Sequence, residues 1–365
     1  METLRELFDS VEGRDWQESA DDAGPVRFAL VGLGGWTRNR AIPAIAESTF
    51  CETSVVVSRS AEKAERVARE VPETERPTAL SGDAFRDGAA TDEYDAVYVC
   101  TPNAVHLPSV ETAADHGKAV LCEKPLEASL ERAERLVAAC QSAGVPLMCA
   151  YRMQTEPLVR TARAAIREGL VGEPAQVHGH MTQPVLSFGG PDQWRLDPDL
   201  AGYGTSVADL GVYPLNTSRF LLDADPEAVT AEFRGSHPAF ADVPDERATF
   251  SLQFPNDVVA ECAASQNLAR SGELRVVGTE GTLTLSPAFF EDEHRELTLR
   301  RGNVDASVRT RHVDQMKEEF DYFADCLLAG REPAANGEHA LVDMRALDAI
   351  YAAAETGSKV SVAER

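Results

Sequence analysis

The strongest constraint on this chain is the alternation of apolar, strand-like segments with helical ones in its first 150 residues. Strands separated by helices of about 10–15 residues are typical of βαβ units. A parallel sheet is covered on both faces, so its strands are continuously apolar. We therefore predict an α/β domain with a parallel sheet. The strand-like segments are 25–34, 53–60, 96–103, 119–125 and 146–151, and the helical ones are 39–48, 61–71, 106–117 and 129–144.

After about Tyr151 the pattern changes to that of an antiparallel sheet. A helical run at 156–172 precedes segments that mostly alternate apolar and polar residues, and the FPND stretch at 254–257 predicts a hairpin. We expect an N-terminal extension over 1–25, read as helical, an α/β domain over 26–150, and an α+β domain with a predominantly antiparallel open sheet over 151–365. The segments of the second sheet are 175–182, 228–235, 247–254, 257–265, 273–278, 281–285 and 296–301, and the closing helical runs are 318–330 and 341–357.

The excess of acidic residues indicates the kind of environment in which this protein is stable. The chain has 60 Asp and Glu residues against 35 Lys and Arg, a net charge of −25, yet 43% hydrophobic residues, which a disordered acidic protein lacks. Molar salt screens charges beyond roughly 3 Å, so such a surface indicates a folded protein adapted to high salt. We expect the cytoplasm of an extreme halophile. Nucleic acid and membranes are disfavoured as partners.

The cysteines and the N-terminus also indicate a cytoplasmic protein. No C-x-x-C pair occurs, and several cysteines lie in apolar runs, so we expect reduced, buried thiols rather than disulfides or a metal site. The N-terminus is acidic and amphipathic, unlike a secretory signal. The cysteines are Cys51, Cys100, Cys122, Cys140, Cys149, Cys262 and Cys326.

A glycine-rich turn, VGLGG, follows the first strand and precedes the first helix. Glycines there permit a tight turn and let a pyrophosphate approach the helix N-terminus, whose free N–H groups favour an anion. The third glycine of the usual G-x-G-x-x-G pattern is a threonine here, and an ordinary strand–turn–helix is the alternative interpretation. The candidate cofactor contacts are Gly32, Gly34, Gly35, Trp36 and Thr37.

The end of the second strand favours NADP over NAD. An NAD-binding domain usually places Asp or Glu there, on the ribose 2′-hydroxyl. This chain has Ser58 and Arg59, with Lys63 a turn later. A guanidinium and hydroxyls would bind a 2′-phosphate, which a carboxylate would repel. The alternative is that Arg59 and Lys63 are only solvated charges.

Two further strand ends carry polar candidates. Thr101, Asn103 and His106 follow the third strand, and Glu123 and Lys124 follow the fourth. Ligands of open α/β sheets bind at carboxyl ends of strands. Lys124 is one of only five lysines, and it could hold a ribose and polarise a substrate hydroxyl. A surface lysine is the alternative.

Asp209 and Tyr213 are four residues apart and would share one face of a helix. Near an ammonium, a tyrosine can serve as a general base, although a core tyrosine with a hydrogen-bonded hydroxyl is the plainer interpretation. His178 and His180 share a strand face, but no third ligand accompanies them, so we expect no metal site.

Together these motifs resemble the glucose–fructose oxidoreductase/inositol dehydrogenase (Gfo/Idh/MocA) family over nearly all of residues 26–365. The resemblance rests on VGLGGWTRNRAIPAI, VVSRSAEKAERVA, CTPNAVHLPSVETAADHGKAVLCEKPLEAS, YRMQTEP, QWRLDP and GTSVADLGVYPLNTSRFLL. It implies a Rossmann domain, then a sheet with helices on one face and subunit contacts on the other. A homo-oligomer, dimer or tetramer, is therefore expected.

The resemblance also implies roles. Lys124 would orient substrate and cofactor and lower the pKa of Tyr213, Tyr213 would accept the proton of the reacting hydroxyl, and Asp209 would bind sugar hydroxyls. The nicotinamide side would be lined by Arg152, Trp194 and Arg195. Many members of the family carry histidine in place of Tyr213. This departure points to the aldose and dihydrodiol dehydrogenase branch.

The composition and motifs together resemble the NADP-dependent D-xylose dehydrogenases of extremely halophilic archaea. We therefore expect oxidation of the anomeric hydroxyl of a pentose, foremost D-xylose, to the aldonolactone. Three alternatives stay open. One is a reductase or trans-dihydrodiol dehydrogenase, another is a glucose–fructose oxidoreductase-like enzyme, and the third is a non-catalytic NADP-sensing regulator on the same fold.

Overall fold

The computed structural model describes residues 11, 13–20, 23–72, 76–309 and 313–362. Two compact units are present. The parallel-sheet unit comprises Trp16–Arg152 and Asp314–Leu341. The open-sheet unit comprises Met1–Asp15, Met153–Val313 and Val342–Arg365.

The parallel-sheet unit is built on a six-stranded sheet with the order β3-β2-β1-β4-β5-β6. Every neighbouring pair is parallel, which confirms the Rossmann-type prediction for this part of the chain. Strands β1, β4, β5 and β6 are nearly all buried along their length, as expected when helices cover both faces, whereas β2 is half buried and the edge strand β3 is mostly half-exposed. They are β1 (Val26–Val31), β2 (Cys51–Ser58), β3 (Thr78–Ser81), β4 (Ala96–Val99), β5 (Ala119–Glu123) and β6 (Leu147–Ala150).

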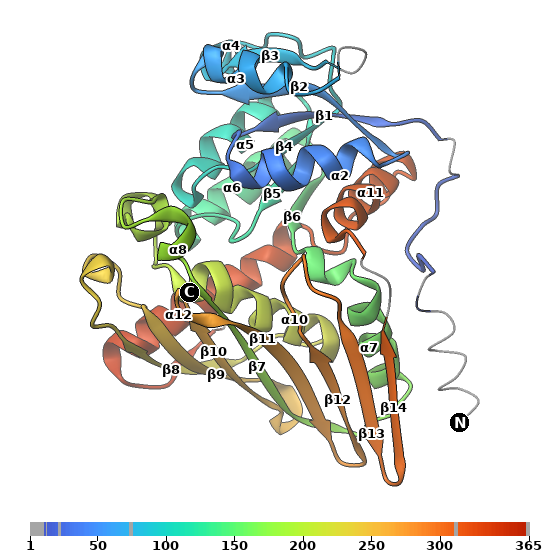
Figure 1. Cartoon of the computed structure of the whole chain (residues 1–365), viewed down its shortest axis with the longest axis vertical. Helices are drawn as coiled ribbons and strands as arrows, with labels where there is room; N and C mark the ends of the chain where they lie inside the picture. The colour runs from blue at the N-terminus through green and yellow to red at the C-terminus, as the bar shows by residue number, and fades with distance from the viewer. Residues whose placement is uncertain (1–10, 12, 21–22, 73–75, 310–312, 363–365) are drawn as a thin grey trace. The chain divides into compact units, whose positions relative to one another are not determined.

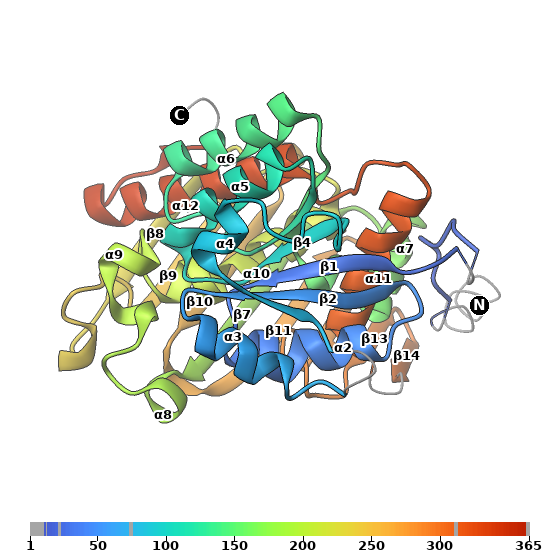
Figure 2. The same ribbon diagram turned by 90° about the horizontal axis from the view of Figure 1, so that it is seen from above.

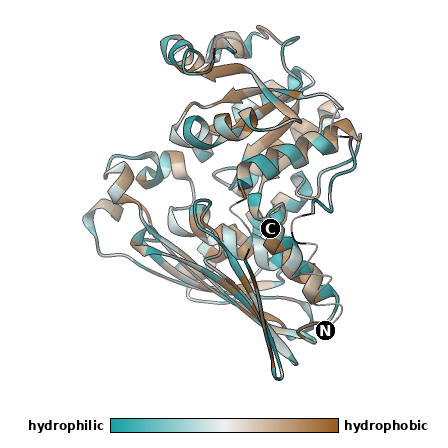
Figure 3. Cartoon of the chain, turned by 45° about the vertical axis from the view of Figure 1, so that its right-hand side comes forward, coloured by the Kyte–Doolittle hydropathy of each residue, from teal (hydrophilic) through white to brown (hydrophobic). Residues whose placement is uncertain are grey.

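Helices lie on both sides of this sheet, with α5 and α6 on one side and α2 and α3 on the other (Figure 2). Local signals set their ends: Ser129 caps α6 by accepting from Arg132 N, and Gly144 ends it in the left-handed conformation. Apolar strands run between helices with hydrophilic outer turns (Figure 3). The helices are η1 (Thr37–Ala41), α2 (Ile42–Ala46), α3 (Ala61–Ala68), α4 (Gly82–Arg86), η3 (Asn103–Val105), α5 (His106–Asp115) and α6 (Leu130–Ala143).

Helix α11 (Gln315–Leu328) also belongs to the parallel-sheet unit, although our prediction assigned everything after residue 150 to one second domain. The physical reason is aromatic packing. The Phe320 ring meets Phe28 of β1 at 5.2 Å and Tyr98 of β4 at 5.0 Å, both edge to face. Helical periodicity identifies the buried face of a helix but not the sheet that the face contacts.

The open-sheet unit is built on a nine-stranded sheet with the order β14-β13-β12-β11-β7-β10-β9-β8-β15 (Figure 1). Only β10 and β7 pair in parallel, which confirms the prediction of a predominantly antiparallel sheet. The strands are β7 (Pro174–Pro184), β8 (Ala228–Arg234), β9 (Arg247–Gln253), β10 (Val259–Ser265), β11 (Asn267–Gly278), β12 (Gly281–Ser286), β13 (Glu296–Arg301), β14 (Val304–Arg309) and β15 (Val360–Ser361).

Burial alternates along these strands, so one face is packed and the other is polar. In β7, Val177 and Met181 are buried while His178 is exposed. The hairpin expected at 254–257 joins β9 to β10, and Asn256 adopts a positive φ there. The helices are α7 (Pro157–Arg167), α8 (Leu186–Gly189), η5 (Trp194–Leu196), α9 (Pro198–Ala201), η6 (Val207–Gly211), α10 (Val212–Leu222), η7 (Pro238–Phe240) and η8 (Pro255–Asp257). The unit boundaries fall within η4 (Arg152–Gln154) and α12 (Gly337–Thr356).

Most of the predicted N-terminal extension lies outside the described residues. Its described residues, 11, 13–20 and 23–25, form turns, bends and irregular structure rather than a helix. Trp16 packs against Tyr322 of α11 at 5.5 Å, and the N–H of Ser19 donates to Asp325 over 2.7 Å. Tertiary contacts thus hold this segment against α11 without helical structure.

The seven cysteines are all free thiols, and six of them are buried, as predicted. Burial raises the pKa of Cys140 to about 12 and that of Cys326 to about 11, so these thiols stay protonated and unreactive near neutral pH. Within the described part of the chain, no helix combines the length and the apolar character needed to span a membrane.

Candidate active-site residues

The glycine turn after β1 has a backbone that only glycine can adopt at its first position. Gly32 has φ +95°, and a Cβ there would lie 2.2 Å from the carbonyl oxygen of Cys100. The Thr37 hydroxyl donates to the Gly32 carbonyl oxygen over 2.6 Å. Threonine in place of the third glycine therefore ties the start of the helix to the end of the strand.

The same turn leaves room and hydrogen-bond donors for a ligand. No atom lies within 4 Å of a Cβ built at Gly34, so the backbone there can be approached closely. Two buried polar atoms near this edge, Nε1 of Trp36 and Oγ1 of Thr101, have no hydrogen-bond partner in the described part of the chain. Buried donors are normally satisfied, so a bound polar molecule is the natural partner. The residues present fit a dinucleotide.

The end of β2 has the arrangement expected for a phosphate rather than a ribose hydroxyl. Ser58 is the last residue of the strand, and Ser60 caps α3 by accepting from Lys63 N over 3.2 Å. Arg59 lies between them with an exposed side chain. No carboxylate occurs from Ser58 to Ser60. This loop therefore presents hydroxyls and cations to an approaching anion.

His106 is fully buried and holds two loops together. Its Nδ1 lies 3.1 Å from the carbonyl oxygen of Leu126, and its Nε2 lies 3.0 Å from that of Thr101. Burial lowers the pKa of this imidazole. Both ring nitrogens face backbone carbonyl oxygens, and the neutral ring donates its single N–H to one of them, which points to a positioning role at the strand end. Asn103, two residues after Thr101, is also buried.

Glu123 and Lys124 close β5 at the carboxyl edge of the parallel sheet. The Tyr98 hydroxyl donates to Oε1 of Glu123 over 2.7 Å, and the Lys124 backbone N–H donates to Oε2 over 3.2 Å. The Glu123 carboxylate is therefore fixed by its own strand end and by β4. The Lys124 side chain is partly exposed.

Our sequence analysis missed Glu319 of α11, a fully buried carboxyl in this region. Neither of its oxygens has a hydrogen-bond partner in the described residues. Burial and the Glu123 carboxylate raise its pKa well above the usual range, whereas Arg152 and Lys124 oppose the shift. The parallel-sheet unit therefore gathers two carboxyl groups and two cations. No local motif marks Glu319, since α11 is distant in sequence.

In the open-sheet unit, Asp209 is the centre of a polar cluster. It lies in η6, and its Oδ2 accepts from Arg195 Nε and from Gln266 Nε2, each over 2.7 Å. The Arg195 guanidinium also lies 4.5 Å from the Trp194 ring centroid. The structure thus brings together Trp194, Arg195 and Asp209. Gln266 was not predicted.

Tyr213 follows Asp209 by four residues, on the first turn of α10, directly after the wide turn of η6. Its side chain is 9% exposed, and its ring lies 5.9 Å from that of Phe289. The predicted helical segment is confirmed. Arg152, which was predicted to line the nicotinamide side together with Trp194 and Arg195, lies in the parallel-sheet unit. Its guanidinium is 5.8 Å from the Trp36 ring centroid.

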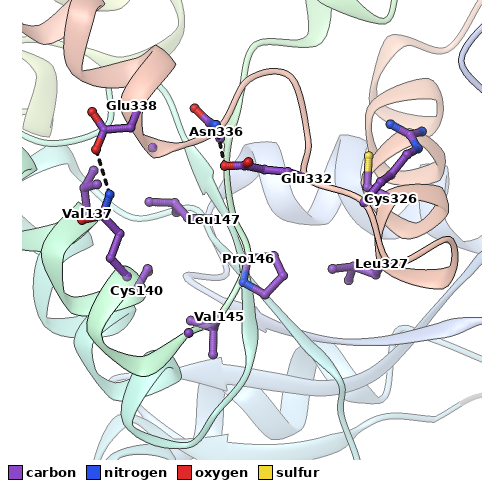
Figure 4. Close-up of a pocket in the computed structure, with 15 residues that line it drawn as sticks. Val137, Cys140, Val145, Pro146, Leu147, Cys326, Leu327, Glu332, Asn336 and Glu338 are labelled. Carbon is purple, nitrogen blue, oxygen red and sulfur yellow. Dashed lines mark hydrogen bonds between the residues drawn. The ribbon is translucent and has the colours of Figure 1, made fainter.

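A hollow of about 390 Å³ lies at the amino end of β6 (Figure 4). Because the strands are parallel and the glycine turn follows the carboxyl end of β1, this is the opposite edge of the sheet. Much of its lining is apolar, including Val137, Leu147 and Leu327. Its carboxylates are bonded to neighbours: Glu332 accepts from Asn336 over 2.6 Å and Glu338 accepts from a glutamine over 2.7 Å. No predicted site residue lines it, so it is not the candidate active site.

No group of three or more His, Cys, Asp or Glu side chains in the described ranges could hold a metal ion. On β7, His180 Nε2 instead lies 2.8 Å from the Ser271 hydroxyl. This pairing accounts for one of the two strand histidines by an ordinary polar contact.

Comparison with protein families gives two matches that together span most of the chain. A family model described as "Oxidoreductase family, NAD-binding Rossmann fold" matches residues 26–151. A second, "GFO/IDH/MocA C-terminal domain", matches residues 159–284.

Individual proteins extend the likeness to the full length. The NADP(+) D-xylose 1-dehydrogenase of Haloarcula marismortui is 51% identical over 355 residues, which is 97% of this chain and 98% of that protein. The D-xylose 1-dehydrogenase (NADP(+)) 2 of Haloferax volcanii is 32% identical over 92% of this chain and 99% of its own length.

Among solved structures, an aldose-aldose oxidoreductase from Caulobacter crescentus, complexed with glycerol, superposes with a TM-score of 0.84. It is 32% identical and covers 92% of this chain and 99% of its own. KijD10, a 3-ketoreductase from Actinomadura kijaniata crystallised with NADP and TDP-benzene, has a TM-score of 0.79 and 25% identity. That likeness covers 90% of this chain and 98% of the other.

Proposed function

We propose, from the premise that this chain belongs to the GFO/IDH/MocA family of oxidoreductases, that it is an NADP-dependent D-xylose 1-dehydrogenase. It oxidises the anomeric hydroxyl of the pentose and yields the aldonolactone. The observation that carries the proposal is the 51% identity over 97% of the chain with an enzyme of that activity. The chemistry also needs a lysine and a tyrosine base, and both are present.

The parallel-sheet unit supplies the cofactor side of the reaction. The turn at Gly32 and Gly34 would take the pyrophosphate, and Ser58 and Arg59 would take the 2′-phosphate. NADP⁺, when bound, supplies the acceptor for the hydride from C1. Lys124, fixed in place through its backbone contact with Glu123, would hold the substrate hydroxyl and stabilise the developing phenolate.

The open-sheet unit supplies the sugar side. Tyr213 would take the proton of the C1 hydroxyl as a general base. Asp209, oriented by Arg195 and Gln266, would accept hydrogen bonds from sugar hydroxyls. The proposal requires Lys124 and Tyr213, which come from different units, to reach the same substrate hydroxyl. Arg152, Trp194 and Arg195 would line the nicotinamide side.

The setting of the enzyme is part of the proposal. We assign it to the cytoplasm of an extreme halophile because of its net charge of −25 and its free thiols. We also propose a homo-oligomer, dimer or tetramer, in which the polar face of the nine-stranded sheet meets another copy. The exposed side chains on that face include His178, Thr249 and Arg275.

A second candidate is an enzyme that keeps its nucleotide bound while it oxidises one aldose and reduces another. The likeness to the aldose-aldose oxidoreductase, at a TM-score of 0.84, favours it. Protein purified without added nucleotide distinguishes the two. Stoichiometric bound NADP(H) would support the second candidate, and nucleotide-free protein that needs added NADP⁺ supports the dehydrogenase.

The test is NADPH formation at molar KCl with xylose, glucose, arabinose, ribose and inositol. We expect the highest kcat/KM with xylose. Tyr213→Phe should lose about 10²- to 10⁴-fold in kcat, the usual contribution of a general base, with NADPH affinity unchanged. Turnover near wild type in this variant, or no activity of the wild type with any aldose, would overturn the proposal.

A further inference from the structure

The start of the helix that carries Asp209 and Tyr213 is held by one buried carboxylate, that of Asp245. Its Oδ1 accepts from Thr205 N and its Oδ2 from Val207 N, each over 2.8 Å. Asp245 lies in the loop before β9, 40 residues away from Thr205 in the sequence, and is fully buried. The first N–H groups of this helical segment therefore find their acceptor in a distant loop rather than in solvent.

The carboxylate is in turn fixed from a third element. The Tyr351 hydroxyl of α12 donates to Oδ2 of Asp245 over 2.6 Å, and the Tyr351 ring stacks on Tyr203 at 5.3 Å. A Cβ built at Gly204 would lie 2.3 Å from Oδ1 of Asp245 and 2.7 Å from Oη of Tyr351. The backbone at Gly204 thus packs directly against the Asp245 carboxylate and the Tyr351 hydroxyl, which leave no room for a side chain at this position.

The same helix start is linked directly to the substrate-side cluster. The Ser206 hydroxyl donates to the carbonyl oxygen of Glu246 over 3.1 Å and accepts from Gln266 N over 2.9 Å. Gln266 donates through its side chain to Asp209. A shift of residues 205–207 would therefore move both the helix and the amide that orients Asp209.

We propose that Asp245 is a positioning residue for Tyr213 and Asp209: its carboxylate fixes the start of the helical segment from which both side chains project. The inference rests on the proposed function, which gives those two side chains their roles. Asp245 touches neither substrate nor cofactor. It acts through the Thr205 and Val207 N–H groups, as an anion placed at a helix N-terminus.

The chemistry of the site explains why an acid is needed there. The backbone N–H groups of Thr205 and Val207 and the Tyr351 hydroxyl converge on the carboxylate, so one side chain satisfies donors from two elements. Burial raises the pKa of Asp245 to about 6, although Tyr351 and the backbone N–H groups favour the ionised form. A neutral amide would turn an N–H₂ group toward a donor.

The test compares full-length Asp245→Asn with wild type in hydrogen exchange and in steady-state kinetics. Loss of a hydrogen bond to a charged group is expected to speed amide exchange in residues 205–212 by about tenfold or more. Misplacement of the helix should lower kcat by about 10- to 100-fold. The affinity for NADPH should stay within about twofold, since the proposed pyrophosphate and 2′-phosphate contacts lie in the other unit.

Asp325→Asn is the matched control. Asp325 is also fully buried and accepts from two backbone N–H groups, at Glu18 and Ser19, but it lies in the parallel-sheet unit. It should lose thermal stability without a change in kcat or in the exchange of residues 205–212. Should Asp245→Asn not fold, Tyr351→Phe removes the side-chain hydrogen bond to the carboxylate and should show the same changes at smaller size.

Unchanged exchange of residues 205–212 in Asp245→Asn would overturn the inference, and so would faster exchange with wild-type kcat. The exchange measurement needs no substrate. An error in the assigned sugar would appear as an inactive wild type. An error in the positioning role would appear in the exchange.

Discussion

The side-chain amide of Gln266 donates to Oδ2 of Asp209 over 2.7 Å, on the same oxygen that accepts from Arg195. Gln183 donates in turn to Oε1 of Gln266 over 3.0 Å, which sets the orientation of the amide. The Asp209 carboxylate is therefore oriented by two donors, the half-buried Arg195 and the buried Gln266. Its orientation is thus defined, as selective binding of a sugar hydroxyl requires.

Gln266→Leu should weaken sugar binding more than it slows turnover. The variant removes a hydrogen bond to a charged group, worth about 1.5–3 kcal/mol, and frees Asp209 to rotate. We expect KM for the sugar to rise by about tenfold or more, with kcat within about threefold. Steady-state kinetics at saturating NADP⁺ measure both. Gln183→Leu acts through Gln266 and should raise KM less. A larger rise in Gln183→Leu than in Gln266→Leu would contradict this series of hydrogen bonds.

Two neighbouring glycines should respond differently to alanine. Gly32→Ala forces a side chain into φ +95° and against the Cys100 carbonyl, so we expect it to destabilise the protein by about 1–3 kcal/mol or more. Gly34→Ala meets no atom within 4 Å. Its free energy of unfolding should stay within about 0.5 kcal/mol of wild type, but a methyl group there would impede a pyrophosphate and weaken NADPH binding. Urea unfolding and fluorescence titration separate the two effects. Equal NADPH affinity in Gly34→Ala would count against the assigned turn.

Ser58→Asp should reverse the preference for NADP. A carboxylate at the end of β2 would repel the 2′-phosphate and bind the ribose 2′-hydroxyl of NAD⁺. We expect KM for NADP⁺ to rise at least about tenfold, while KM for NAD⁺ stays equal or falls. Ser58→Asn, which adds similar bulk without charge, is the control. If both variants raise KM for NADP⁺ alike, the effect is steric and the phosphate site lies elsewhere.

The pH dependence of stability should carry a contribution from Asp245. Its pKa of about 6 in the folded protein exceeds the usual value of about 3.9, so folding favours the protonated acid. The free energy of unfolding therefore gains from protonation of Asp245; this gain is complete below about pH 4 and is lost as the pH rises through about 6, where the carboxylate ionises. Urea unfolding between pH 4 and 7.5, at constant salt, should therefore show a steeper decline for wild type than for Asp245→Asn. Parallel curves would show that Asp245 titrates normally.

Sequence reasoning found the elements whose signal is local. The turn at Gly32, the strand ends at Ser58 and Lys124, and the helical spacing of Asp209 and Tyr213 all depend on neighbours in the chain. The hairpin at 254–257 is of the same kind. The roles assigned to these residues stay predictions, because they concern molecules that bind to the protein.

The features that were missed depend on long-range packing. Strand β3 is four residues long, TALS, and β14 reads VDASVR, so neither has a strong pattern of its own. The other missed residues are single polar side chains: Glu319 in α11, Gln266 between β10 and β11, and Asp245 in the loop before β9. Their contacts form only when the chain folds and brings these segments beside elements distant in sequence. No periodicity or motif identifies such contacts before the topology is known.

Salt dependence is the sharpest test of the proposed halophilic setting. The net charge of −25 produces self-repulsion that exposed ion pairs, such as Arg300 with Asp305 at 3.1 Å, offset only weakly. Because the screening length falls from about 10 Å at 0.1 M salt to about 3 Å at 1 M, Tm should rise steadily with KCl. NaCl should act in the same direction. A non-ionic osmolyte at equal osmolality should raise Tm less, because it is excluded from the protein surface but does not screen charge. Calorimetry across this series measures the effect, and full stability of the protein in dilute buffer would contradict adaptation to high salt.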